Sequence, residues 1–168
     1  MTSRLVTLKR AIGGFVGGLE DIRDVQPFGK LIEAEDIARV LFKSPCAFVS
    51  VLAAPGGEAL PEGDSRTRVD VAVGVAAKGS PGTPEDEETL GAAEAIYRAV
   101  RWRTFGLDHI WPAQDRRMEI VPVPGRTGVA ILAVRWSHFM IIDDADVIDD
   151  EAEFETSERP EGTLREPT

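Results

Sequence analysis

The sequence contains few of the residues that form covalent or metal-linked structures. Its 168 residues include one cysteine, Cys46, and two histidines, His109 and His138. A lone cysteine excludes an internal disulfide and a zinc site made of several cysteines in one chain. Cys46 follows Pro45 and precedes an apolar run, which predicts a buried and inert thiol. No cysteine or carboxylate lies at metal-binding spacing from either histidine, so we expect both to be partly buried packing residues.

The sequence also lacks a long apolar run. Residues 5–19 come nearest, but Lys9, Arg10 and four glycines interrupt them, and a membrane-spanning helix needs about 18 apolar residues in succession. The N-terminus has no apolar block followed by a small-residue cleavage site, as a signal peptide has. We therefore expect a soluble protein that stays in the compartment where it is made and has no membrane partner.

No motif for catalysis or phosphate binding is present either. There is no G-x-S-x-G elbow for a serine nucleophile, and the glycines of residues 13–18 lack the spacing of a nucleotide-binding loop. Asp70, followed by Lys78, weakly resembles a metal-dependent nuclease arrangement, but Ala76 occupies the place of the second carboxylate. We predict a protein that is not an enzyme, with no catalytic residue, cofactor or metal, and keep the nuclease as a remote alternative.

Basic residues are scarce at the C-terminal end. Residues 143–168, which we call the acidic extension, hold eleven of the 29 carboxylates and two arginines, and so carry nine of the ten net negative charges. The other 142 residues are nearly neutral, so this part is not built to hold a polyanion tightly. We predict a domain over residues 1–142 followed by a solvated extension. Apolar residues such as Val147, Ile148 and Phe154 give the extension a means of docking on a neighbouring subunit.

Periodic patterns predict the secondary structure. Apolar residues at helical spacing indicate a helix over residues 5–19, although glycines at positions 13, 14, 17 and 18 weaken it. Those glycines indicate either close approach of a neighbouring backbone or an early helix end near Gly13, which is the favoured interpretation. Further helices are predicted at 33–42 and 85–103, and strands at 22–28, 46–53, 66–77, 117–123 and 129–142.

This order favours an α+β fold: a mixed, largely antiparallel sheet of four to five strands, with helices packed on one side. The strand over residues 66–77 has the clearest alternation, with valines on one face and small residues on the other. The small face includes Ala72, Gly74 and Ala76, where another surface can pack closely.

Basic and aromatic residues gather after the helix over residues 85–103. Arg98, Arg101, Trp102, Arg103 and Phe105 partly imitate the basic stripe with stacking aromatics of a nucleic-acid binder. The favoured interpretation is a helix end whose positive charge suits the helix dipole, with the aromatic rings folded into the core.

The order of the segments is similar to that of the Mu-like family of tail terminator proteins from contractile-tailed phages. The similarity covers approximately residues 1–142, and the acidic extension has no counterpart in it. It is carried by the opening helix at 5–19 and by the segments SPCAFVSV, TRVDVAVGVAAKG, GAAEAIYRAVRW, FGLDHIWP and GVAILAVRW.

The resemblance implies a structural virion protein, assembled in the host cytoplasm, that forms a hexameric ring on the completed tail tube. Such a ring stops tube growth and joins the tail to the head. Its expected partners are copies of itself, the tail tube protein and the head–tail connector protein, while DNA passes through without specific binding. Another neck component, such as a head–tail connector or tail completion protein, is the alternative.

A ring needs contact surfaces, and two sets of residues are candidates. The candidate subunit contacts are small or aromatic: Ala72, Gly74, Ala76, Trp102, Trp111 and Trp136. The candidate contacts to tube or connector lie in the loops over residues 55–65 and 78–84: Gly56, Gly57, Glu58, Glu62, Asp64, Lys78 and Ser80.

Overall fold

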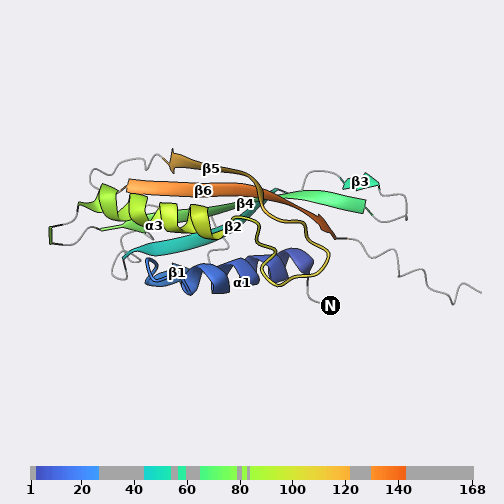
Figure 1. Ribbon diagram of the computed structural model, residues 1–168, viewed down its shortest axis with the longest axis horizontal. Coiled ribbons are helices and arrows are strands. Elements are labelled where there is room, and N and C mark those ends of the chain that lie inside the picture. Colours follow the sequence, from blue (N-terminus) through green and yellow to red (C-terminus); the bar gives the residue numbers. More distant parts are fainter. Residues whose placement is uncertain are drawn as a thin grey trace, which may run out of the picture.

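The protein has an α+β fold in which one mixed sheet is covered on one face by two helices (Figure 1). A computed structural model describes residues 3–26, 44–53, 57–59, 65–78, 81–82, 84–121 and 130–142. The predicted helix at 33–42 and the acidic extension lie outside the described residues. The elements follow in the order α1 (Arg4–Gly17), β1 (Asp24–Gln26), β2 (Cys46–Ala53), β3 (Gly57–Ala59), β4 (Ser65–Ala77), α3 (Glu85–Ala99), β5 (Gln114–Val121) and β6 (Ala130–Ile141).

Five strands lie in the order β1-β2-β4-β6-β5, and β3 pairs with β4 beside this row. β1 runs parallel to β2, whereas every other pairing is antiparallel. The prediction of a mixed, largely antiparallel sheet is therefore confirmed. β1 and β5 form the two edges of the row, and β4 lies between β2 and β6 near its centre.

The alternating pattern of β4 explains its central place. Its four valines face the helices and are fully buried, and Val73 lies between Val49 of β2 and Val134 of β6. Side chains from both helices complete this core: Leu8, Ile12 and Val16 from α1, and Ala92, Ala93 and Ile96 from α3. Alternation of period two puts all four valines on one face, so one layer of helices is enough to bury them.

The glycines of α1 do not end the helix. The helix continues to Gly17, so the favoured interpretation of an early end near Gly13 is wrong. A Cβ atom at Gly13 would lie 3.9 Å from a methyl group of Val25, and one at Gly17 would lie 3.4 Å from the other. Both distances are ordinary van der Waals contacts with a side chain, so neither glycine is required by close approach of a neighbouring backbone, which was the other interpretation. Gly14 has no neighbour within 4 Å of its added Cβ.

We expect Gly14→Ala to raise the free energy of unfolding by about 1 kcal/mol, because alanine is the better helix former and the added methyl group meets no atom. Gly82→Ala is the matched control, since its surroundings are equally open but its φ is 88°. Gly82→Ala should lower the free energy of unfolding by about 1–2 kcal/mol, because residues other than glycine avoid positive φ. Urea titrations measure both, and changes of the same sign would contradict the assignment.

Some element boundaries differ from the predicted ones. The helix predicted to reach residue 103 ends at Ala99, because the chain then enters turns in which Trp102, Phe105 and His109 have positive φ. Of the strand predicted at 22–28, Asp24–Gln26 forms a strand, Ile22 and Arg23 precede it, and residues 27–28 lie outside the described residues. Within the described part of the chain, no helix is long and apolar enough to cross a membrane.

Candidate functional site

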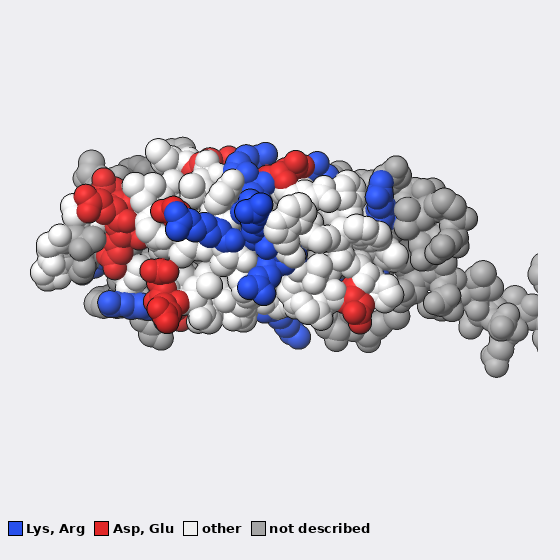
Figure 2. Space-filling view, in the orientation of Figure 1, with Lys and Arg blue, Asp and Glu red and all other residues white. Residues whose placement is uncertain are grey.

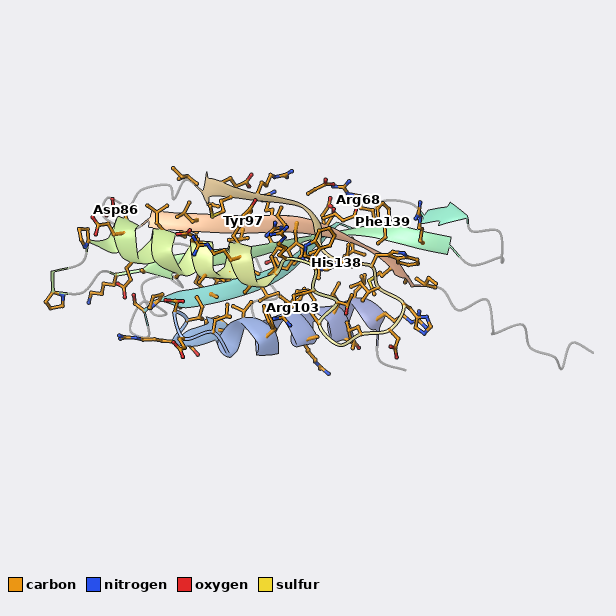
Figure 3. All side chains as sticks on the ribbon, viewed as in Figure 1. Arg68, Asp86, Tyr97, Arg103, His138 and Phe139 are labelled. Carbon is orange, nitrogen blue, oxygen red and sulfur yellow. The ribbon has the colours of Figure 1, made fainter. Side chains whose placement is uncertain are left out.

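His138 is the most deeply buried polar group of the sheet. It lies on β6, is fully buried, and takes part in two hydrogen bonds (Figure 3). The indole Nε1–H of Trp136 donates to Nε2 of His138 over 2.7 Å, so Nε2 is unprotonated and Nδ1–H donates to the Trp111 carbonyl over 2.8 Å. The ring is therefore neutral and completely bonded, with Phe105 packed edge-on against it at 5.5 Å. This is a structural histidine.

The expectations for the histidines were half right. His138 packs in the core, as predicted for both, whereas His109 is exposed in a turn. Cys46 is buried as predicted, and burial, with a smaller contribution from the negative charge of Asp24, raises the pKa of its thiol to about 11.

We expect His138 to make stability depend on pH. Burial lowers the pKa of His138 in the folded protein, and the bond to Trp111 opposes this only in part. Just below pH 6.5 the imidazole of His138 therefore binds a proton in the unfolded chain but not in the folded chain. The contribution of His138 to stability is complete above its ordinary pKa of 6.5 and is lost as the pH falls below it. The free energy of unfolding should fall by at most about 1.4 kcal/mol per pH unit from this group.

Urea unfolding of His138→Gln and His109→Gln at a series of pH values checks this expectation. The exposed His109 serves as the control, and its variant should keep the pH dependence of the original protein. The His138 variant should be less stable but should lose the part of the slope just below pH 6.5. A His138 variant with an unchanged slope would contradict the account.

The predicted small-residue contact lies inside the subunit. Ala72 is 8% exposed and Ala76 is fully buried, on the face of β4 opposite the helices. A Cβ atom on Gly74 would lie 3.6 Å from Phe48 of β2 and 3.9 Å from Ile131 of β6, so side chains of the flanking strands lean over the glycine. The expectation that one domain leaves this stripe uncovered is wrong, because Ala72 and Ala76 are already buried within a single subunit.

The three tryptophans do not form one surface. Trp136 is 2% exposed in the core, Trp111 is half-buried, and Trp102 is 70% exposed. Phe105 packs against Phe15 at 5.3 Å and joins the core. The interpretation that the aromatic rings after α3 fold inward is therefore right for Phe105 and wrong for Trp102.

Part of one predicted contact loop is a strand. Gly57 and Glu58 belong to β3, which pairs with the outer end of β4. Lys78 is exposed directly after β4, and its backbone N–H donates to Ser44 Oγ over 2.8 Å. Gly56, Glu62, Asp64 and Ser80 lie outside the described residues.

Charged residues pair with one another on the sheet face opposite the helices. Arg68 Nε lies 3.0 Å from Asp70 and Arg68 Nη1 lies 3.2 Å from Asp115, while Arg135 pairs with Glu119. These side chains border a cavity of about 260 Å³. Because each arginine there has a carboxylate partner, the cavity offers no uncompensated charge to a ligand.

The nuclease alternative gains no site from this arrangement. Asp70 is bonded to Arg68 and lies about 20 Å from Ala76, the place of the second carboxylate, measured as six residues of extended strand. Lys78 follows at that far end. Among the described residues, no three histidine, cysteine or carboxylate side chains are grouped as metal ligands.

Arginines that have no carboxylate partner among the described residues gather instead around the C-terminal end of α3. Arg101, Trp102, Arg103 and Arg116, which we call the arginine patch, lie on the helix-covered side, where Figure 2 shows a band of lysine and arginine across the middle of the molecule. Arg116 Nη1 donates to the Tyr97 carbonyl over 2.6 Å, and its guanidinium lies 4.5 Å from the Tyr97 ring centre. The Arg103 guanidinium lies 5.1 Å from the Phe15 ring (Figure 3).

An apolar strip lies along the edge strand β5. Met118 and Ile120 are 43% and 80% exposed, and they share with Arg116 the strand face that looks toward the helices. Arg116 reaches α3, but the helix does not cover the two residues beyond it. The outer edge of β5 has no strand partner among the described residues. An unpaired edge with exposed apolar side chains is a surface on which another chain can pair.

An apolar groove lies at the opposite edge of the sheet. It has a volume of about 470 Å³ between α1 and β1 and is lined by Val6, Lys9, Arg10, Gly13, Gly14, Val25, Gln26 and Val49. The glycines of α1 help to form it, because Gly13 and Gly14 place no side chain there. The sequence shows these glycines but does not predict a groove, because the second wall is β1, whose position depends on the fold.

The β5 strip and the α1–β1 groove, neither of which was predicted from the sequence, are two surfaces of the described residues that suit apolar contact with a macromolecule. The strip is exposed because α3 does not cover the end of β5, and the groove is open because glycines of α1 place no side chain in it. No protein-family model and no curated protein matches this chain.

Proposed function

We propose that this protein is a structural subunit of a phage neck, a tail terminator that forms a hexameric ring on the tail tube and joins the tail to the head connector. The order of its segments supports the proposal, because it resembles the Mu-like tail terminators over residues 1–142. The α+β fold implied by that resemblance is the fold observed.

The observation that carries the ring is the presence of two unlike surfaces at opposite edges of one sheet. The β5 strip has protruding side chains, Met118 and Ile120, and the α1–β1 groove is hollow. β5 and β1 are separated by four strand spacings, or about 19 Å. A contact between unlike surfaces repeats from copy to copy, and it closes into a ring when the rotation between copies allows.

The sizes and chemistry of the two surfaces agree. The groove of about 470 Å³ has room for an isoleucine and a methionine side chain, and its walls include Val6 and Val25. Burying such side chains contributes about 1.5–3 kcal/mol each. The strip and groove therefore supply apolar contact without any change of the subunit core.

The charge distribution suits a ring that DNA traverses. Residues 1–142 are nearly neutral. Each contact between a phosphate and a lysine or arginine would release counterions, which favours binding and would therefore slow a passing duplex. The tail tube and head connector as partners rest on the family resemblance.

Light scattering and electron microscopy of the full chain, alone and with purified tail tubes, test the proposal. We expect a particle of six times 18.2 kDa, either free or formed on the tube end, seen as a six-fold ring. Tubes assembled with the protein should have one length, and tubes assembled without it should vary. A protein that stays monomeric with tubes and leaves their length unchanged would overturn the proposal; binding to the connector alone would favour another neck component.

A further inference from the structure

The arginine patch has charge that the described part of the chain does not neutralise. Arg101 and Arg103 are exposed and Arg116 is half-buried. None of the three forms an ion pair with a carboxylate of a described residue, whereas neighbouring Arg98 pairs with Glu94. Unlike the cavity on the other face, this surface therefore attracts an anionic group.

Trp102 gives the same surface an apolar centre. It is 70% exposed, the Arg101 guanidinium lies 5.9 Å from its ring, and its φ of 59° holds the side chain in a turn outside the core. Aromatic and arginine side chains are the residues that most often anchor a macromolecular contact. A fitting ligand is thus acidic and carries a large apolar side chain.

The acidic extension has this composition. It carries nine net negative charges, and Phe154 follows the run Asp149-Asp150-Glu151 by three residues. The sequence DDEAEFE therefore places carboxylates on both sides of an aromatic ring, matching arginines on both sides of Trp102 in Arg101-Trp102-Arg103.

The extension also begins within reach of the patch. Phe105 joins the two places, since it packs against Phe15, beneath Arg103, and against His138 of β6. His138 precedes Ile142, the last described residue, by four positions. The twelve residues from Ile142 to Phe154 span up to about 40 Å when extended. A tethered segment of this length has an effective concentration in the millimolar range, far above that of a free competitor.

We propose that the acidic extension docks on the arginine patch, with Phe154 against Trp102 and the carboxylates beside Arg101, Arg103 and Arg116. The docked extension neutralises this basic surface and keeps nucleic acid from it. This inference does not depend on the ring, because the extension can reach the patch of its own subunit.

A fluorophore on the extension of the full chain tests the docking. Cys46 is buried, so Ala152→Cys supplies the reactive thiol for an environment-sensitive label. The label should emit at shorter wavelength and with higher anisotropy in low salt than in 1 M NaCl, where the Debye length is about 3 Å. Arg101→Glu/Arg103→Glu should give the high-salt spectrum already in low salt.

The matched control is Arg23→Glu/Lys78→Glu, which reverses two exposed charges away from the patch and should leave the label docked. Phe154→Ser should release it without altering any charge. Circular dichroism of each variant verifies folding, and light scattering reports the ring separately. Identical spectra for the parent and the patch variant would overturn the proposal. If oligothymidine bound at the patch while the label never docked, the proposal would be overturned and the patch would be a nucleic-acid site.

Discussion

Val73→Asp should abolish folding. Val73 is fully buried at the centre of β4, between Val49 and Val134, and it faces the helices. An aspartate there would bury a carboxylate with no partner, and changes of this kind exceed about 4–5 kcal/mol in unfolding free energy. Small domains have only about 5–15 kcal/mol in total. We expect the variant to show no cooperative thermal transition and to accumulate as insoluble protein.

The matched control for this result is Ile120→Asp. It also replaces a branched aliphatic residue of a strand by aspartate, but at a side chain that is 80% exposed. At concentrations where the protein is monomeric, its free energy of unfolding should stay within about 1 kcal/mol of that of the original protein, because changes at exposed positions are usually small. A Val73→Asp protein that is soluble and unfolds at the normal temperature would refute the placement of β4 in the core.

Ile120→Asp should abolish ring formation while leaving the subunit folded. In the proposed ring, Ile120 and Met118 of one copy enter the α1–β1 groove of the next. An aspartate would remove the apolar side chain that packs against Val6 and Val25, and the nearby Lys9 and Arg10 would not replace this lost apolar contact, so every interface of the ring would carry the defect. A loss of about 3 kcal/mol per interface corresponds to more than a hundredfold weaker contact. Light scattering should therefore report a monomer at concentrations where the original protein forms the hexamer.

Leu90→Asp is the control for this loss. Leu90 is 51% exposed on α3, outside the strip and the groove, so its variant should still assemble. Gly14→Leu approaches the same contact from its other side, since its side chain would fill the groove. Normal assembly by both Ile120→Asp and Gly14→Leu would exclude this contact, even if a ring formed through other surfaces.

The sequence was most informative where one local pattern decided the structure. The bounds of β2 agree with the predicted 46–53, and β4 differs from its predicted range by one residue. In both, the apolar pattern also sets the burial, because every second residue faces the helices and these residues are apolar. The helix after β4 was placed correctly at its start but not at its end, since the turn at Trp102 depends on tertiary contacts of Phe105 with Phe15 and His138.

Surface properties were less predictable. Nothing in the local sequence distinguishes Trp136, which hydrogen-bonds His138 in the core, from Trp102, which lies in solvent. The exposure of Ile120 depends on where α3 lies across the sheet, and the cover over Gly74 depends on Phe48 and Ile131 from two other strands. The exposure of these residues depends on contacts between segments that are far apart in the sequence.

The longest ladder of the sheet has a consequence for biosynthesis. β4 and β6 pair from Arg66 with Ile141 to Ala77 with Ala130, so the central strand finds this neighbour only after the intervening α3 and β5 have been made. Pairings between distant segments slow folding. Until the ribosome releases β6, the backbone edge of β4 that pairs with it stays open, and a chaperone would act on the nascent polypeptide in this interval.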